Sequence, residues 1–234
     1  METLDIPFVY QWDLRPEDEP SADFCATAGV TRPPQGWAER SCGIACLAML
    51  LGFWDRHAEM RTLLHEAIES GAWGGERNWR HTELVGLLGR RGLTAWRRNW
   101  RLLEGREREY LDGRIADEGT AAELGRVRSQ MIDEGLYTLK SAVASGQPAI
   151  ASIYRPAWDR RSPGHMIVLT GWHSGELRYH DPAEQDGADS TTSVADFRRC
   201  WKGTAIFAVA REDAKDENAN EDEDEDEDKH QGRA

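Results

Sequence analysis

The 234-residue sequence has no apolar run long enough to cross a membrane. Its longest such run, residues 44–53, is far shorter than the roughly 20 residues that a spanning helix needs. The start, Met1-Glu-Thr-Leu-Asp, contains no apolar segment of the kind found in secretory signals. The sequence also lacks a G-x-x-x-x-G-K-[ST] phosphate-binding motif. These absences argue against a membrane partner and a P-loop nucleotide site, and we expect a cytoplasmic protein.

Positive charge is scarce relative to negative charge, with 29 Lys and Arg against 42 Asp and Glu, and a net charge of −13. No basic stripe of the kind that displaces counterions from nucleic acid is present, so we expect no nucleic-acid partner. Residues 212–228 hold 12 of the acidic residues and a single lysine, Lys215. We predict that 211–234 is a disordered acidic tail, which either solubilises the chain or contacts a basic partner.

Cysteine is also scarce, and a chain without an export signal keeps its thiols reduced in the cytosol. The four cysteines are Cys25, Cys42, Cys46 and Cys200. Cys42-x-x-x-Cys46, together with His165, His173 and His180, raises the possibility of a zinc site. Structural zinc sites usually pair two such cysteine knuckles, and the sequence has no second pair. We therefore expect no metal and no other cofactor.

Tryptophan is abundant, with 10 residues, and 39% of the chain is hydrophobic, which favours a folded core. Helical patterns come first and β-rich apolar runs later, which predicts an α+β fold. The expected helices are 41–54, 57–70, 81–91, 121–145 (one or two helices broken near Gly135) and 193–201. The expected strands are 6–12, 94–100, 147–154, 165–172, 176–180 and 204–210, and residues 13–40 are expected to form a loop.

Cys42 is the first candidate for chemistry, because Ser41-Cys42-Gly43 opens the most apolar predicted helix. The partial positive charge at a helix N-terminus stabilises a thiolate and lowers its pKa. Gly43 would leave room for a substrate backbone. The competing interpretation is that Cys42 is a small core residue, as we expect for Cys46 one turn further on.

His165 and Asp181 stand at the ends of two successive predicted strands. A carboxylate there could orient the imidazole and favour its charged form. A two-residue turn at 174–175 would place Asp181 opposite Val168, three residues short of His165, so a longer turn or a bulge is needed to bring them together. Taken singly, His165 is better explained as a surface histidine and Asp181 as a turn residue before proline. A cysteine opening a central helix, followed by histidine and aspartate on successive strands, is nevertheless how a papain-like site is assembled.

Several segments resemble the bacteriocin-processing (double-glycine leader) cysteine peptidases and their stand-alone relatives. They are the 41–51 helix Ser-Cys-Gly-Ile-Ala-Cys-Leu-Ala-Met-Leu-Leu, the 164–172 strand Gly-His-Met-Ile-Val-Leu-Thr-Gly-Trp, His-Asp-Pro at 180–182, Ile-Pro-Phe-Val-Tyr-Gln-Trp at 6–12 and Phe-Arg-Arg-Cys-Trp-Lys-Gly at 197–203. The resemblance implies a papain-like fold, in which a central nucleophile helix packs on an antiparallel sheet. It also implies that Cys42 is the nucleophile, His165 the general base and acid, and Asp181 the orienting residue.

A glutamine donates to the oxyanion in this family. Gln11 matches the stand-alone pattern, whereas Gln35 misses by one residue the position used in the transporter-linked enzymes, so we favour Gln11. The implied function is a cysteine peptidase that hydrolyses an amide bond of a peptide or protein substrate through a thioester. A papain-like acyl or peptidyl transferase, or a peptide-binding module without catalysis, stays open as an alternative.

The predicted domain organisation is one catalytic domain over 1–210, with a helical, Trp-rich insertion at about 73–135. The 123-residue gap from Cys42 to His165 exceeds what we expect for a minimal catalytic domain of this kind. The tryptophans near arginines in this stretch are explained by core filling, by cation–π packing or by a substrate groove. If this stretch forms a different substrate groove, the protein binds a different substrate. The resemblance therefore does not imply specificity for double-glycine leaders.

Overall fold

The protein is described by a computed structural model covering residues 3–74, 78–101, 118–154 and 164–211. The α-helices are α1 (Ala22–Thr27), α2 (Cys42–Phe53), α3 (Met60–Glu69), α4 (His81–Arg90), α6 (Glu118–Ala144) and α7 (Val194–Cys200), and the 3-10 turns are η1 (Gln11–Asp13), η2 (Pro16–Asp18) and η3 (Ala38–Arg40). The strands are β1 (Leu93–Asn99), β2 (Ala149–Tyr154), β3 (Gly164–His173), β4 (Glu176–His180), β5 (Ser190–Ser193) and β6 (Trp201–Ala210).

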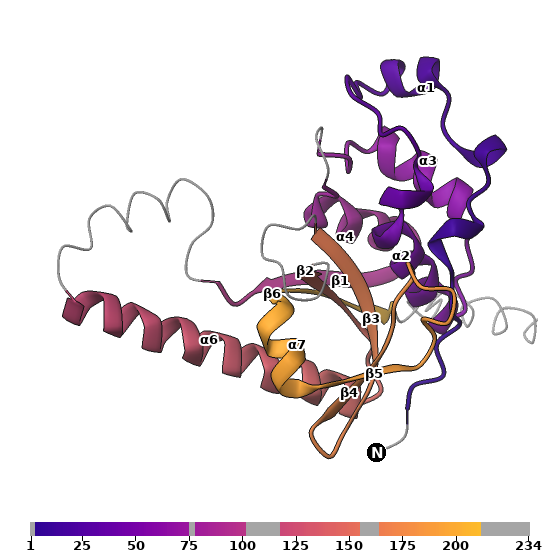
Figure 1. Cartoon of the computed structure of the whole chain (residues 1–234). Coiled ribbons are helices and arrows are strands. Elements are labelled where there is room, and N and C mark those ends of the chain that lie inside the picture. The colour runs from indigo at the N-terminus through magenta and orange to yellow at the C-terminus, as the bar shows by residue number, and fades with distance from the viewer. Residues whose placement is uncertain (1–2, 75–77, 102–117, 155–163, 212–234) are drawn as a thin grey trace, which may run out of the picture.

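The strands form one six-stranded sheet in the order β1-β6-β2-β3-β4-β5, and each neighbouring pair is antiparallel. Helices α2, α3 and α4 pack on one face, and α6 and α7 on the other (Figure 1). The predicted α+β class, with a central helix on an antiparallel sheet, is confirmed. Most expected elements are present within a few residues of their predicted ends, while β5 was not predicted.

Strand β3 lies inside the sheet and is buried on both faces, which explains its nearly continuous apolar sequence. Met166 and Val168 pack into the core that contains α2. Ile167 and Leu169 pack into the second core, with α6 and α7. This alternation follows the two-residue period of a strand, and it anchors β3, of which His165 is the second residue.

Helix α2 is buried along its length, as its apolar sequence predicts. Ser41 precedes this helix, and a serine at that position often caps the first turn, but here it does not. The Ser41 hydroxyl donates to the carbonyl oxygen of Trp37 at 2.7 Å and makes no bond to the first turn of α2. The reason is the 3-10 turn η3 directly before the helix, which brings the Trp37 carbonyl within reach. The first-turn N–H groups of α2 are therefore left without a side-chain cap beside Cys42.

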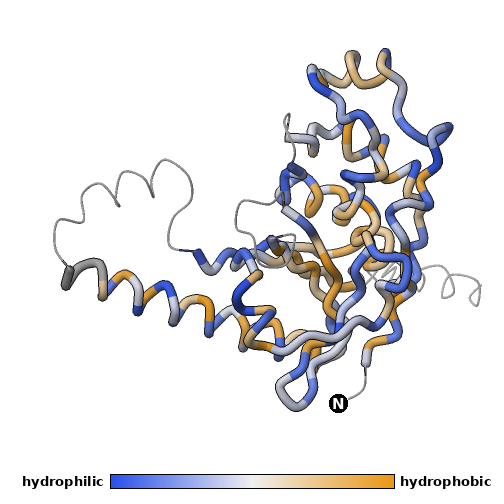
Figure 2. Tube along the Cα trace, in the orientation of Figure 1, coloured by the Kyte–Doolittle hydropathy of each residue, from blue (hydrophilic) through white to orange (hydrophobic). Residues whose placement is uncertain are grey.

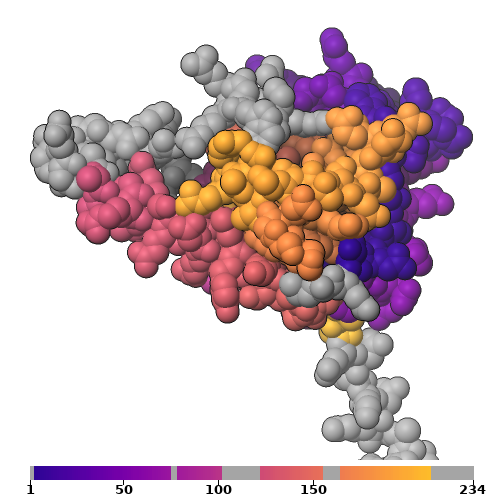
Figure 3. All heavy atoms as spheres, turned by 60° about the horizontal axis from the view of Figure 1, so that its bottom comes forward, coloured from indigo at the N-terminus to yellow at the C-terminus, as the bar shows by residue number. Residues whose placement is uncertain are grey.

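Helix α6 is continuous through Gly135, so the expected break is wrong. A Cβ atom at position 135 would lie 2.5 Å from the Trp201 ring and 2.8 Å from the Trp100 ring. Glycine is therefore used for close packing and not to end the helix. Hydrophobic and hydrophilic segments alternate along α6 (Figure 2), and its N-terminal part extends outward from the sheet (Figures 1 and 3).

The predicted strand over 6–12 is wrong. This segment and the residues before it make isolated contacts and do not pair with a strand. Leu4 N–H donates to the Thr170 carbonyl at 2.8 Å, and His180 Nε2 lies 2.9 Å from the Ile6 carbonyl oxygen. Gln11 then opens η1. The loop expected over 13–40 is largely irregular but includes α1 and the short turns η2 and η3.

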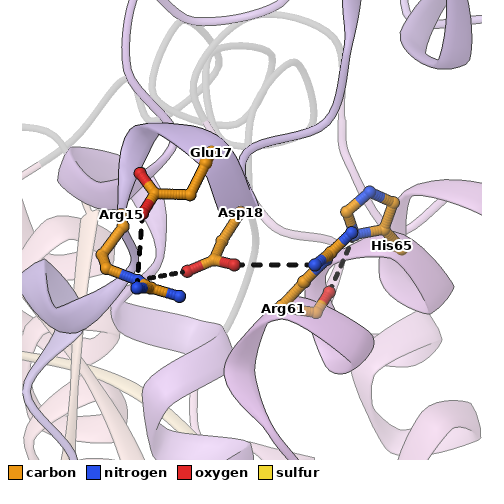
Figure 4. Close-up of polar contacts among 5 residues, drawn as sticks. All are labelled: Arg15, Glu17, Asp18, Arg61 and His65. Carbon is orange, nitrogen blue, oxygen red and sulfur yellow. Dashed lines mark hydrogen bonds and ion pairs between the residues drawn. The ribbon is translucent and has the colours of Figure 1, made fainter.

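Asp18 of η2 joins the segment after η1 to helix α3 (Figure 4). Its carboxylate lies 3.1 Å from Arg15 Nε and 3.7 Å from Arg61 Nη1. Both arginine side chains are more than half exposed, so these pairs contribute little to stability.

Residues 73–135, where we predict an insertion, include α4, β1 and the first part of α6, and β1 forms an edge of the sheet beside β6. The proposed limits of this insertion stay a prediction. The predicted acidic tail lies, from residue 212 onward, outside the described residues. Over the described ranges, none of the helices combines the length and apolarity that membrane crossing requires.

Candidate active site

A cleft of about 660 Å³ opens at the N-terminus of α2, beside the ends of β2, β3 and β6. Cys42 and His165 line it together with Gln11. Gln35, the alternative glutamine, is exposed and is not among the described residues that line the cleft. The structure therefore gathers three of the four candidate residues around one cavity, and Asp181 lies directly behind His165.

The β3–β4 hairpin brings Asp181 toward His165. The turn has the predicted two residues, Ser174 and Gly175, both with positive φ, as a type I′ turn requires. The register then shifts between Leu169 and Gly171, which leaves Thr170 as an extra residue in β3. This bulge pairs Val168 with His180 and moves Asp181 one step nearer to His165.

His165 and Asp181 meet in a buried hydrogen bond of 2.7 Å between Nε2 and Oδ1. His165 is 5% exposed and Asp181 is 9% exposed, so water does not screen the contact. Asp181 Oδ1 also accepts the backbone N–H of Ala183 at 3.0 Å, which fixes the carboxylate. Because Nε2 is engaged by the carboxylate, Nδ1 is the ring nitrogen that remains for Cys42.

The pKa of the Cys42 thiol is lowered from its ordinary value. Burial alone would raise this pKa, but a side-chain hydrogen bond and the charge of His165 outweigh it. Backbone hydrogen bonds from Met166 and Gly43 act in the same direction. The position of the thiol at an uncapped helix N-terminus is therefore combined with a cationic partner, and both favour thiolate.

The pKa of His165 is raised to about 9. Burial would lower it, but the hydrogen bonds to Asp181 and Cys42, together with their charges, outweigh that effect. A raised histidine pKa beside a lowered cysteine pKa shifts the proton from the thiol toward the imidazole. The arrangement therefore favours a thiolate on Cys42 and an imidazolium on His165, beside the Asp181 carboxylate.

Gln11 is 2% exposed and is tied to the aspartate loop, because its backbone N–H donates to the Pro182 carbonyl at 2.8 Å. Its side-chain Nε2 lies 3.4 Å from the Glu39 carbonyl oxygen, at the long end of the hydrogen-bond range. Its Oε1 is buried without a partner among the described residues. A buried, weakly engaged amide at the cleft wall is suited to bind a polar atom of a ligand.

Trp79 is a site residue whose position the sequence pattern did not reveal. Its indole N–H donates to the Arg40 carbonyl at 2.6 Å, and a Cβ atom at position 43 would lie 3.1 Å from its ring. Gly43 therefore lets Trp79 approach the first turn of α2 closely. The tryptophan forms a wall of the cleft beside Cys42.

Gly187 supports the site from the loop that follows β4. A Cβ atom there would lie 2.0 Å from the carbonyl oxygen of Asp181, a clash with backbone that no rotamer change could relieve. The Asp181 N–H in turn donates to the Gly187 carbonyl at 2.8 Å. The tight loop of 181–187 therefore depends on glycine, and the sequence offered only the motif Asp-Gly at 186–187 as a signal.

Two other candidates for metal or thiol chemistry, Cys46 and His180, are buried within the fold. Cys46 is fully buried, and burial raises the pKa of its thiol well above its ordinary value. His180 is held between the Ile6 carbonyl oxygen and the Asp189 N–H. Within the parts of the chain that the structure describes, no group of three or more His, Cys, Asp or Glu residues could hold a metal ion.

Comparisons with known proteins agree with this architecture. A family profile described as "Peptidase_C39 like family" matches residues 3–206. A putative C39-like peptidase from Bacillus anthracis is 15% identical, with 91% of this chain and 100% of that chain covered and a TM-score of 0.51. The peptidase domain of Streptococcus ComA, a bifunctional ABC transporter involved in a quorum-sensing pathway, is 17% identical over 74% of this chain and 93% of that chain (TM-score 0.49).

A double-glycine-motif protease from an AMS/PCAT transporter, solved with its leader peptide, is 14% identical over 89% of this chain and 94% of that chain (TM-score 0.49). A search of curated proteins finds no match. The profile match spans most of the chain, and the Bacillus anthracis structure shares its fold. The chain belongs to the C39-like family of cysteine peptidase-like proteins and has their papain-like fold.

Proposed function

We propose that this protein is a cysteine peptidase that hydrolyses a peptide amide bond through a thioester on Cys42. One observation carries the proposal: Cys42 and His165 line one cleft at the N-terminus of α2, and Asp181 forms a buried hydrogen bond with His165. The lowered pKa of the thiol and the raised pKa of the imidazole favour the charged pair that such a reaction needs.

In the proposed reaction, Cys42 Sγ attacks the carbonyl carbon of the scissile amide, and the π electrons move to the oxygen. As the tetrahedral intermediate collapses, the C–N bond breaks and His165 gives its Nδ1 proton to the leaving amine. Water then attacks the thioester while His165 takes up a proton from it. Cleavage of the C–S bond releases the acid and restores the thiolate. Asp181 holds the imidazole throughout.

The oxyanion would be held by the Gln11 side-chain amide and by N–H groups at the start of α2. Two features support this role. Gln11 Nε2 makes only a long bond in the structure, and the Ser41 side chain does not cap the helix. Preorganised donors of this kind stabilise charge that develops in the transition state.

The test is selective alkylation with iodoacetamide at pH 7, followed by peptide mapping. Cys42 is expected to react first, at a rate at least about tenfold above the other cysteines, because its thiol alone is both cleft-lining and lowered in pKa. Burial raises the pKa of Cys25, and it raises that of Cys200 to about 11. Faster labelling of Cys25 or Cys200 would refute an activated Cys42.

A Cys42→Ala variant should lose all turnover of peptide substrates. Its free energy of unfolding should stay within about 2 kcal/mol of that of the parent, since only one sulfur atom is removed. Cys46→Ala is the matched comparison, because it removes a thiol from the same helix outside the cleft. Full activity of Cys42→Ala would mean that another residue is the nucleophile.

A further inference from the structure

The cleft carries a charge opposite to that of the chain. Among the described residues that line it, four are permanent cations and one is a carboxylate, Glu39, whereas the whole chain has a net charge of −13. The cations are Arg40, Arg97, Arg101 and Lys202. Arg40 Nη2 lies 3.4 Å from Glu39 Oε1, so the positive charge of Arg40 balances the negative charge of this carboxylate. The remaining cations come from β1, the residues after it, and the start of β6.

The direction of Arg97 follows from the alternation along β1. Leu93 and Ala95 pack into the core on the α2 side of the sheet, and Arg97 continues the same row. Its neighbour Arg98 points to the other face, where it pairs with Glu134 at 3.8 Å and lies over the Trp100 ring. Arg97 is thereby aimed into the cleft by the sheet, at the level of Ile206 on β6.

Lys202 is placed at the entrance of the histidine strand. Its Nζ lies 4.7 Å from the centre of the Tyr154 ring, and a Cβ atom at position 164 would lie 2.6 Å from it. Gly164 therefore makes room for the ammonium group directly beside His165. A substrate bound in the cleft would meet this charge, since Lys202 lines the same cavity as Cys42 and His165.

We propose that the cleft selects peptides that carry a carboxylate close to the scissile bond, supplied by an Asp or Glu side chain or by a free C-terminus. This inference rests on the proposed peptidase function and names its substrate class. A concave site lined by one sign of charge concentrates ligands of the opposite sign and speeds their association. Arginine and lysine then bind the carboxylate through charge-assisted hydrogen bonds.

The experiment uses the full chain and a peptide library in three forms: one with Asp or Glu at each position in turn, one with Asn or Gln at the same positions, and one with an amidated C-terminus. The acid form is expected to exceed its amide form by about tenfold in kcat/KM at one or two positions, and this ratio should fall as NaCl rises from 50 to 500 mM. The amidated series distinguishes a side-chain carboxylate from a terminal one.

Arg97→Gln and Lys202→Gln are each expected to lower the acid-to-amide ratio by about threefold to tenfold, the range for a charged hydrogen bond at a partly exposed site. Lys202→Glu should lower the acid-to-amide ratio further than Lys202→Gln does, because it places a negative charge in the cleft. Arg98→Gln is the matched control, because it removes the same charge from the adjacent residue on the opposite face. It should leave the ratio unchanged.

The outcomes separate this inference from the proposed function. Equal cleavage of acid and amide peptides by the parent and all variants would overturn the carboxylate selectivity and leave the peptidase intact. If no peptide is cleaved, fluorescence anisotropy with the same peptides decides. Salt-sensitive binding of acidic peptides that depends on Arg97 would uphold the selectivity and reject the peptidase. Binding that is equal for acid and amide forms would overturn both.

Discussion

At the residue scale, Asp181 Oδ1 accepts two hydrogen bonds, one from His165 Nε2 and one from the Ala183 backbone. The backbone bond keeps the carboxylate in place, and the imidazole bond is the largest of the interactions that raise the pKa of His165. The orientation and the charge of the histidine therefore depend on the same oxygen atom.

We predict that Asp181→Asn moves the alkaline limb of the kcat/KM profile to lower pH and lowers kcat/KM at pH 8 by about 10²-fold. The imidazolium donates to the leaving amine, so activity is lost as pH rises through the His165 pKa of about 9. Without the carboxylate this pKa falls, and the loss begins earlier. Asp186→Asn, an exposed change in the same loop, should leave the profile where it is. An alkaline limb in its original place for Asp181→Asn would contradict the assigned role.

A second prediction concerns the two glutamines. Gln11→Ala should lower kcat by about 10²–10³-fold, the typical loss when one oxyanion donor is removed. Gln35→Ala, an exposed change outside the cleft, should leave kcat unaltered. Steady-state kinetics of the two variants separate the alternatives, and the opposite pattern of losses would assign the donor to Gln35.

The candidate residues Cys42, His165 and Asp181 could be found in the sequence because each is adjacent to an element with a clear pattern. Trp79 and Gly187 could not be assigned to the site. Their roles depend on close approaches to backbone atoms, the Arg40 carbonyl for Trp79 and the Asp181 carbonyl for Gly187. Such contacts leave no periodic signal.

At the scale of elements, local rules predicted the helices except α1 and most of the strands, and they failed where a distant segment decides the conformation. The turn at 174–175 follows from its two residues, but the bulge at Thr170 does not. The Thr170 carbonyl accepts from Leu4, which is 166 positions earlier in the chain. The mistaken strand over 6–12 has the same origin, since Ile6 and Gln11 make their contacts with His180 and Pro182.

Helix α6 provides a prediction about packing. Gly135→Ala should lower the free energy of unfolding by about 1–3 kcal/mol, because its Cβ would collide with Trp100 and Trp201. Gly125→Ala on the same helix meets no atom within 4 Å and should be neutral or stabilise by up to about 1 kcal/mol. Urea denaturation measures both. A stabilising Gly135→Ala would show that the helix does not pack as described.

At the scale of the whole molecule, the cleft and the last described residues lie toward opposite ends of β6. Lys202 and Thr204 line the cleft, whereas Arg211, just past the strand, donates its N–H to the Gly92 carbonyl. Thr204 and Ala210 are six residue steps apart along β6, a distance of roughly 20 Å. Arg211, the last described residue, therefore lies well away from the cleft.

We predict that a chain ending at Arg211 keeps kcat/KM on short peptides within about twofold of the full chain, since the described fold and cleft are retained. The measurement compares both proteins on acidic and neutral peptides at two salt concentrations. A large loss of kcat/KM would show that the acidic segment takes part in catalysis. A gain confined to acidic peptides at low salt would show that the segment competes for the cationic cleft.

The unpaired residue at Thr170 also limits how the hairpin between His165 and Asp181 can change. Inserting or deleting one residue there would slide β4 along β3 by one strand step, about 3.3 Å, which exceeds the length of the bond between imidazole and carboxylate. Exposed positions of the hairpin tolerate substitution, but the hydrogen bond between His165 and Asp181 fixes the number of residues between them. In divergent relatives, we expect insertions to accumulate elsewhere and the count of residues in this hairpin to persist.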